Sequence, residues 1–353
     1  MPRLRRADLR APGIRRRRAG KGWAFYTPSG EKISDPGELA RLRGLVIPPA
    51  WRDVWICPWP NGHIQAVGTD AAGRRQYRYH DSWRVQRDQA KHERVLDFAT
   101  QLPALRERLV AELRAEAPAL SRRRVLAAAV RLLDLGFFRI GGEEYAEEHG
   151  TFGLATLRKD QVTVSGGVLV FDYVAKHGKQ REQSVADEDV LEVVQVLKRR
   201  RGGGEELLAY REDDGGAGAS GAWRDVKSGD INGYLHEVLG AGFTAKDFRT
   251  WHATVLMAVG LAVSRQAAQA SESARKRAVA RAVREVSEYL GNTPAVARKS
   301  YIDPRLIDLY EDGVTIAPTL ERLGESGQFG QLATQGAIEQ AVLDLLRHDQ
   351  VAT

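Results

Sequence analysis

The stretch that decides the fold is "VTVSGGVLVFDYVAKHGKQREQSV", Val162 to Val185. Valines at every second position lead into Gly166-Gly167 and resume after it. This alternation around two glycines predicts a β-hairpin. A second turn, "KHGK" at residues 176–179, sends the chain back as a third strand. The stretch therefore predicts a three-stranded antiparallel meander.

Helical patterns flank this meander on both sides. Before it, in the third of three predicted helices, Leu126, Val130, Leu133 and Phe137 recur at spacings of four, three and four, which indicates a buried stripe. The predicted helices cover residues 82–101, 103–117, 121–135, 187–200, 228–240, 245–263, 272–290, 294–301 and 335–349. The meander is therefore expected to lie within a mainly helical domain.

Residues 22–85 have a different character, with short strand-like pieces separated by turns. "GWAFYTPSGEKI" predicts a hairpin over Pro28-Ser29-Gly30, and "PNG" and "AAG" mark two further turns. One helix is expected near Pro36 to Arg43. The fold class is therefore α+β, with a small β-rich N-terminal domain (22–85), a larger helical domain (86–320) and a C-terminal tail or helix (321–353).

The chain is basic overall. Lys plus Arg number 53 against 46 Asp plus Glu among 353 residues, for a net charge of +7. Eight arginines fall within residues 1–21, which we interpret as a flexible basic arm. The excess of basic over acidic residues favours a polyanionic partner, either nucleic acid or an anionic membrane. A basic protein with a merely solvated tail has the same composition.

Several classes of site are excluded by the sequence. Cys57 is the only cysteine, so neither an internal disulfide nor a thiolate zinc site can form, which suits a reducing cytoplasm. No uncharged apolar run reaches the ~18 residues of a membrane span, and no secretory signal is expected. "GIRRRRAGKG" lacks the spacing of a nucleotide-binding loop, and H-E-x-x-H is absent.

Carboxylates also fail to suggest a metal site. Glu143, Glu144, Glu147 and Glu148 are paired at helical spacing, and we interpret them as a solvated helix face. The sequence therefore predicts no cofactor, no metal and no nucleotide.

One tyrosine stands in an unusual place, in "LGNTPAVARKSYIDP", Leu290 to Pro304. Thr293 suits a helix N-cap and Pro294 the first helical position, so Tyr301 ends a short helix. If Tyr301 were a nucleophile toward a phosphodiester, its phenol, with an ordinary pKa of ~10, would need cations nearby. A half-buried structural tyrosine is the alternative.

Candidate cations occur elsewhere in the chain. Arg139 follows an apolar helix beside Gly141-Gly142, Lys176 lies in the second meander turn, and Lys246 and Arg249 share one helix face. Guanidinium groups can stabilise charge on non-bridging oxygens, and a lysine can protonate a leaving alkoxide. Ion pairing, solvation and a basic helix surface are the respective alternatives.

Taken together these residues resemble those of the type IB DNA topoisomerases, in the small bacterial and poxvirus-like branch, from about Gly22 to Asp312. The resemblance rests on "FFRIGGEEYAEEHGTFGLATL", "FDYVAKHGK", "KDFRTWHAT" and "GNTPAVARKSY". It implies the tyrosine recombinase and topoisomerase IB catalytic fold. It also implies Tyr301 as nucleophile, Lys176 as general acid, Arg139 and Arg249 as catalytic arginines, and Asn292 as oxyanion ligand.

The resemblance extends to DNA contacts. "GRRQYRYH" is similar to the family's DNA-reading strand, which implies contacts from Gln76, Tyr77 and Tyr79. Tyr145 resembles a tyrosine that contacts the DNA backbone, and Lys246 is expected to contact DNA. Strand periodicity puts Tyr77 and Tyr79 on one face.

The resemblance also implies an activity. A monomer would close around duplex DNA as a clamp, cleave one strand through a 3′-phosphotyrosine, allow strand rotation and religate, without ATP or metal. Such an enzyme is expected in the cytoplasm, associated with the nucleoid. Two alternatives remain: a tyrosine recombinase, in which His-x-x-Arg typically replaces "KDFR", and a non-catalytic DNA-binding protein whose arginines contact phosphates.

Overall fold

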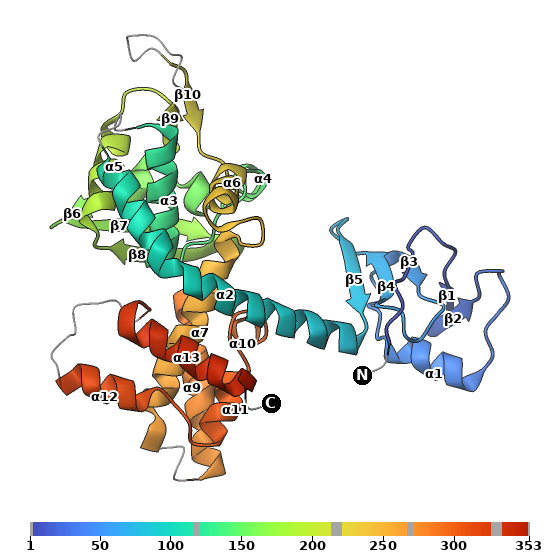
Figure 1. Cartoon of the computed structure of the whole chain (residues 1–353). Coiled ribbons are helices and arrows are strands. Elements are labelled where there is room, and N and C mark those ends of the chain that lie inside the picture. Colours follow the sequence, from blue (N-terminus) through green and yellow to red (C-terminus); the bar gives the residue numbers. More distant parts are fainter. Residues whose placement is uncertain (1–2, 116–119, 213–220, 267–270, 326–333, 352–353) are drawn as a thin grey trace. The chain divides into compact units, whose positions relative to one another are not determined.

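The computed structural model describes residues 3–115, 120–212, 221–266, 271–325 and 334–351 (Figure 1). The chain divides into two compact units, Met1–Glu93 and Arg94–Thr353. This division falls inside one long helix, α2 (Asp81–Arg114). The predicted α+β class, with a β-rich N-terminal part and a helical part containing a meander, is confirmed.

From residue 3 onward, the N-terminal unit contains two small antiparallel sheets, one short helix and the first part of α2. In the short helix, the Asp35 carboxylate accepts from the Glu38 N–H at 2.7 Å, and Pro36 opens the first turn, where the sequence predicts the helix to begin. The elements are β1 (Arg15–Ala19), β2 (Gly22–Tyr26), α1 (Pro36–Gly44), β3 (Arg52–Ile56), β4 (Ile64–Thr69) and β5 (Arg75–Tyr79). The first two strands pair with each other, and the last three form a meander.

The basic N-terminal segment is built into this unit, which differs from the predicted flexible arm over residues 1–21. β1 pairs with β2 along its length, so the strand partner of β2 precedes it in sequence. The Arg16 guanidinium donates to the carbonyls of Ile47 at 2.9 Å and Pro48 at 2.7 Å. An arginine that satisfies three backbone carbonyls, Trp51 included, gains more from the fold than from solvent.

The C-terminal unit is mainly helical. The predicted helices from residue 121 onward are confirmed, and the glutamates that were interpreted as a helix face lie on a short helix, Glu143–His149, whereas the helix Ala317–Glu325 was not predicted. Besides the second half of α2, the helices are α3 (Arg122–Gly136), α4 (Glu143–His149), α5 (Glu188–Arg199), α6 (Ser228–Leu239), α7 (Ala245–Val263), α9 (Glu272–Leu290), α10 (Pro294–Ser300), α11 (Arg305–Glu311), α12 (Ala317–Glu325) and α13 (Gly336–Val351).

The two helices predicted at 82–101 and 103–117 are wrong in one respect, because α2 continues through Pro103. A proline inside a helix removes one backbone hydrogen bond and costs ~3 kcal/mol. Buried Leu102 and Leu105 flank it, and Leu109 and Leu113 continue the same buried face. Burying each leucine contributes ~1.5–3 kcal/mol, which is enough to keep the helix continuous.

The predicted meander is confirmed as β6 (Val162–Ser165), β7 (Val168–Ala175) and β8 (Lys179–Val185). Gly166 and Gly167 both have positive φ, at 56° and 80°, as a tight hairpin turn requires. The inner face of β7 packs into the core, with Phe171 edge-to-face against Phe138 at 4.9 Å. The meander therefore fixes the segment that follows α3.

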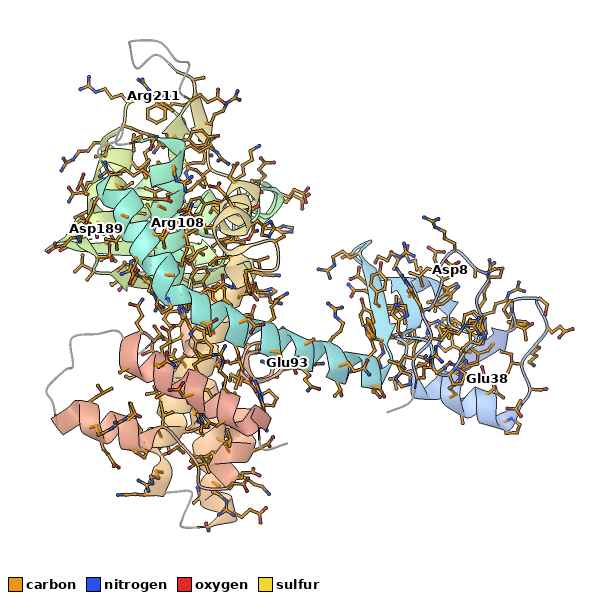
Figure 2. All side chains as sticks on the ribbon, viewed as in Figure 1. Asp8, Glu38, Glu93, Arg108, Asp189 and Arg211 are labelled. Atoms are coloured by element: carbon orange, nitrogen blue, oxygen red, sulfur yellow. The ribbon has the colours of Figure 1, made fainter. Side chains whose placement is uncertain are left out.

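Two short strands and a surface ion pair complete the upper part of this unit in Figure 1. β9 (Ala209–Arg211) pairs with β10 (Trp223–Asp225), and Arg211 lies at this end (Figure 2). The glycine-rich composition of residues 212–222 predicts a flexible loop, and most of this segment, residues 213–220, lies outside the described residues. Arg114 donates to Asp189 at 2.7 Å, which ties the end of α2 to the start of α5.

A buried polar network joins four helices of the unit. Arg106 on α2 donates to both carboxylate oxygens of Asp134 on α3, each at 2.9 Å, and also contacts Glu339 on α13 at 2.6 Å. Glu339 accepts from the indole of buried Trp251 on α7 at 2.7 Å. Through this network α13, which the sequence suggested as part of a tail, belongs to the core of the unit.

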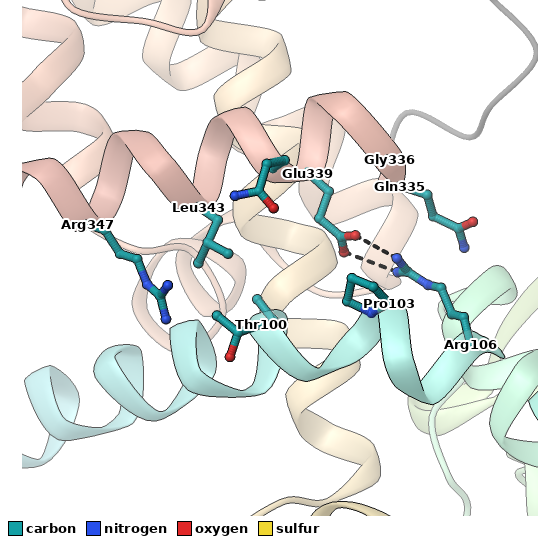
Figure 3. Close-up of a pocket in the computed structure, with 10 residues that line it drawn as sticks. Thr100, Pro103, Arg106, Gln335, Gly336, Glu339, Leu343 and Arg347 are labelled. Carbon is teal, nitrogen blue, oxygen red and sulfur yellow. Dashed lines mark hydrogen bonds and ion pairs between the residues drawn. The ribbon is translucent and has the colours of Figure 1, made fainter. Parts of the chain in front are cut away.

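A cavity of about 450 Å³ lies beside this network between α2 and α13 (Figure 3). The hydrogen-bonded pair Arg106 and Glu339 lines it, with Pro103 next to them, and Leu343 and Arg347 lie further along α13. In the part of the chain that the structure describes, no helix is both long and apolar enough to cross a membrane.

Candidate active site

Tyr301 ends α10 in the manner that the sequence predicts. Thr293 caps the helix by accepting from the Val296 N–H at 3.3 Å, and the Tyr301 N–H donates back to Ala297 at 3.0 Å. Thr254 on α7 donates to the Tyr301 carbonyl at 3.3 Å. The residue is largely buried, with 9% of its surface exposed. Its backbone is therefore held from two sides.

Tyr301 lines a cavity of about 360 Å³ in the C-terminal unit. Four other residues predicted for the site, or for DNA contact beside it, line the same cavity: Arg139, Lys176, Lys246 and Arg249. The remaining lining residues are Ile140, Gly141, Gly142, Thr151, Phe152 and Ala245. Segments more than 150 positions apart in sequence thus converge on one hollow.

Arg249 is the most deeply buried of the cations, with 4% of its surface exposed. Its guanidinium donates to the carbonyls of Phe137 and Leu290, the latter at 2.7 Å, and lies 5.5 Å from the centre of the Tyr301 ring. Burial and the nearby Arg139 charge lower its pKa to about 10. Arg249 is still protonated near neutral pH, so it brings a fixed positive charge to the phenol.

The backbone of Arg139 is held by a close approach of two glycine segments. Gly141 has a φ of +90°, and a Cβ on Gly153 would lie 2.5 Å from the Gly141 backbone. Because neither position has a side chain, the Leu154 N–H can donate to the Arg139 carbonyl at 2.8 Å. The guanidinium then reaches across to the Asn292 side-chain oxygen.

Asn292 follows Gly291, which has a φ of +61° and ends α9. The Asn292 N–H donates to Ser287 at 2.9 Å, while its side-chain oxygen accepts from Arg139. Its amide nitrogen Nδ2 is buried and has no acceptor among the described residues. A buried donor without a partner costs about 1–3 kcal/mol, so this orientation is expected to serve an incoming acceptor. Asn292 does not line the cavity itself but touches Arg139, which does.

Lys246 lies one turn before Arg249 on α7, with its Nζ 5.8 Å from the centre of the Tyr301 ring. Burial raises the pKa of Tyr301, but Arg249, Arg139 and Lys246 together outweigh it, and the net pKa is below the ordinary value of 10.0. The surroundings therefore stabilise the phenolate relative to that of an ordinary tyrosine.

Lys176 begins the turn between β7 and β8, where His177 has a φ of +68°. Its side chain is exposed and lines the cavity from the meander. Lys176 is thus held on a turn, whereas Lys246 and Arg249 lie on the helix α7. Such a position allows it to approach a bound ligand.

The predicted DNA-reading residues lie on β5 in the N-terminal unit. The rings of Tyr77 and Tyr79 stack at 6.0 Å with an interplanar angle of 16°, so the predicted shared face is confirmed. Gln76 donates to Asp70 at 2.9 Å. Tyr145 lies in α4, and its side chain is outside the described residues.

One interpretation of carboxylates needs correction. Glu143 is not simply solvated, because its Oε1 accepts from the Ser228 N–H at 2.8 Å and so caps the start of α6. Nothing in the local sequence of α4 indicates this long-range cap. Over the described ranges no group of three or more metal-ligating side chains is found.

Two further residues that shape the site were not predicted. Thr254 holds the Tyr301 carbonyl, but it lies five positions after Arg249, about 140° round the helix, so helical spacing does not place it on the face of Lys246 and Arg249. Arg181 on β8 donates hydrogen bonds to two carbonyls at the end of α9. Only the tertiary fold brings these two segments together.

Comparisons with known proteins agree with this geometry. Residues 80–315 match the family model for the catalytic core of eukaryotic DNA topoisomerase I, and residues 22–70 match that for the N-terminal domain of bacterial DNA topoisomerase IB. A DNA topoisomerase 1B of Acanthamoeba polyphaga mimivirus is 29% identical over 301 residues, which cover 85% of this chain and 88% of the viral protein. The catalytic-core match alone spans more than half of the chain. The second match covers most of the β-rich N-terminal part. This protein therefore belongs to the type IB DNA topoisomerase family.

Proposed function

We propose that this DNA topoisomerase relaxes supercoiled duplex DNA by transient cleavage of one strand, with Tyr301 as the nucleophile. The phenolate oxygen attacks a backbone phosphorus, and the bond from phosphorus to the 5′-oxygen breaks. A 3′-phosphotyrosine and a free 5′-hydroxyl result. The cluster of Arg249, Arg139 and Lys246 around a phenol of lowered pKa is the observation that carries this proposal.

Charge develops on the non-bridging oxygens as the phosphorus becomes pentacoordinate. In this proposal Arg139 and Arg249 bind these oxygens through guanidinium N–H groups, and Asn292 adds its unpaired Nδ2 donor. Asparagine cannot supply a proton as an acid, so its role is confined to hydrogen bonding.

The leaving 5′-oxygen needs a proton, which we assign to Lys176. After strand rotation the same lysine accepts the proton back as the 5′-hydroxyl attacks the phosphotyrosine. The phosphodiester energy is kept in the covalent intermediate, so the cycle is proposed to need neither ATP nor a metal ion. A monomer acting on DNA at the nucleoid is the simplest form of this proposal.

A relaxation assay tests the function directly. Supercoiled plasmid incubated with the protein and a chelator, without ATP, is expected to relax, and denaturing gels are expected to trap protein on the 3′ end of the cleaved strand. Relaxation that requires ATP or magnesium would contradict the proposal, as would attachment to a 5′ end.

Lys176→Ala is expected to slow cleavage by about 10²–10⁴-fold at saturating DNA, because the alkoxide would leave unprotonated. A substrate with sulfur in place of the leaving 5′-oxygen restores the rate of this variant, since a thiolate leaves without a proton. Rates are measured in single turnover with both substrates. A deficit of equal size on the sulfur substrate would show that Lys176 is not the acid.

The pH dependence of cleavage should report the phenol. Because the pKa of Tyr301 is lowered partly by Lys246, removing that charge in Lys246→Met raises the pKa and moves the rising limb of the rate profile to higher pH. At pH values below this rising limb, Lys246→Met is expected to cleave several-fold more slowly than wild type at saturating DNA. Lys246→Arg keeps the charge and serves as the control. A limb that stays in place in Lys246→Met would contradict this account.

A further inference from the structure

The C-terminal end of α9 is held by three arginines from three different elements. Arg181 on β8 donates to the carbonyls of residues 288 and 289, at 2.8 Å and 2.7 Å. Arg249 donates to that of residue 290 at 2.7 Å, and Arg139 to that of residue 291 at 3.4 Å. The last carbonyls of a helix lack intrahelical partners and carry the negative end of its dipole, so guanidinium groups stabilise them.

Arg181 differs from the other two arginines because it does not line the cavity. Its forked guanidinium spans two successive carbonyls and lies directly under Gly291, where Nη1 is 3.3 Å from the position that a Cβ would take. Gly291 is the residue before Asn292. Arg181 thus fixes the turn from which the Asn292 side chain projects.

The strand that carries Arg181 also carries the general-acid turn. Arg181 pairs with Tyr173 across β7 and β8, and these strands are joined by the turn that begins at Lys176. A contact from Arg181 to the end of α9 therefore links the meander to the Asn292 turn. Arg181 also hydrogen-bonds the Tyr173 side chain on β7, and among the described residues it forms no ion pair.

We propose that Arg181 is a positioning residue for cleavage, which acts by holding the Asn292 amide in line with the scissile phosphate. It touches neither the nucleophile nor the reacting oxygens. Its removal lets the end of α9 shift, and a displacement of about 1 Å at a reacting centre can cost ~10²-fold in rate. This inference rests on the proposed role of Asn292.

The experiment is a double-mutant cycle on single-turnover cleavage at saturating DNA. Arg181→Ala alone is expected to cleave ~10- to 10²-fold more slowly with unchanged DNA affinity. Asn292→Ala alone is also slow. If Arg181 acts through Asn292, adding Arg181→Ala to Asn292→Ala costs little more, whereas independent effects would multiply. Multiplying effects, or a fully active Arg181→Ala, would overturn the inference.

Two further variants test whether Arg181 acts through its hydrogen-bond geometry, through its charge alone, or through a general loss of stability. Arg181→Lys keeps the charge but one ammonium cannot span two carbonyls as a fork does, so it stays impaired in cleavage. Full activity of Arg181→Lys would mean that only the charge matters, and would overturn the inference. Arg114→Ala removes an exposed arginine of the same unit and is expected to cleave normally.

Failure of the inference and failure of the proposed function are distinguishable. If Asn292→Ala cleaves at the wild-type rate, the inference falls while Tyr301 remains the nucleophile. If the wild-type protein forms no 3′ adduct, the proposed function falls, and the inference falls with it.

Discussion

Tyr301→Phe is expected to abolish both relaxation and the covalent protein–DNA adduct. The substitution removes one oxygen and leaves the ring, so the packing around α10 and the cation contacts with the ring are retained. Loss of a nucleophile commonly costs on the order of 10⁴- to 10⁶-fold. The measurements are plasmid relaxation and denaturing-gel capture of the adduct, over a wide range of protein concentration.

The control for this experiment is DNA affinity, which is expected to remain within a few-fold of wild type. Phosphate contacts from arginine and lysine supply most non-specific affinity, and none is changed. A Tyr301→Phe protein that still relaxes plasmid would disprove the nucleophile. A protein that neither binds DNA nor melts at the normal temperature would instead indicate misfolding, and Tyr301→Ser would then be compared.

Asp134→Ala is expected to lower the free energy of unfolding by about 3–5 kcal/mol, because it leaves buried arginine charge without its partner. Asp134 is 1% exposed and accepts from Arg106, from Arg131 at 3.0 Å and from Gln335 at 3.1 Å. Urea unfolding and a fall in melting temperature of roughly 10 °C would measure the loss. The matched control is Asp189→Ala, whose exposed partner Arg114 makes a loss below about 1 kcal/mol the expectation.

The same carboxylate gives this stability a pH dependence. Burial opposes ionisation, yet hydrogen bonds and charge from His252 and Arg106 outweigh it and lower the pKa of Asp134 below its ordinary 3.8. A group with a lowered pKa in the folded state stabilises above its unfolded pKa and loses that contribution as the pH falls through the folded value. The difference in free energy of unfolding between wild type and Asp134→Ala is therefore expected to become smaller in strong acid. A difference that becomes larger there would contradict this account.

Much of the site could be predicted from local pattern. The glycine pair of the meander turn, the Thr293 and Pro294 helix start and the spacing of Lys246 and Arg249 each have a local cause, and the structure places them as expected. Because α7 and α10 are specified by residues that lie close together in the sequence, their residues could be assigned to helix faces before any tertiary contact was known.

What could not be predicted depends on contacts between distant segments. Arg16 looked like part of a free basic tail because its three carbonyl partners lie more than thirty positions away. Pro103 looked like a helix boundary because the packing that overrides it comes from other helices. Arg181 carries no sequence signal at all, since its partners on α9 are backbone carbonyls and any residue could supply them.

Glu339 lies beyond the end of the family match but inside the compact C-terminal unit. The match to the catalytic-core model ends at residue 315, yet the compact C-terminal unit includes α13, whose Glu339 carboxylate accepts from Arg106 and Trp251. Trimming the chain at residue 315 would leave the buried Trp251 indole without its acceptor and would leave Arg106 with one of its two carboxylate partners, Asp134. The segment that the catalytic-core model matches and the segment that packs as one unit thus end at different residues.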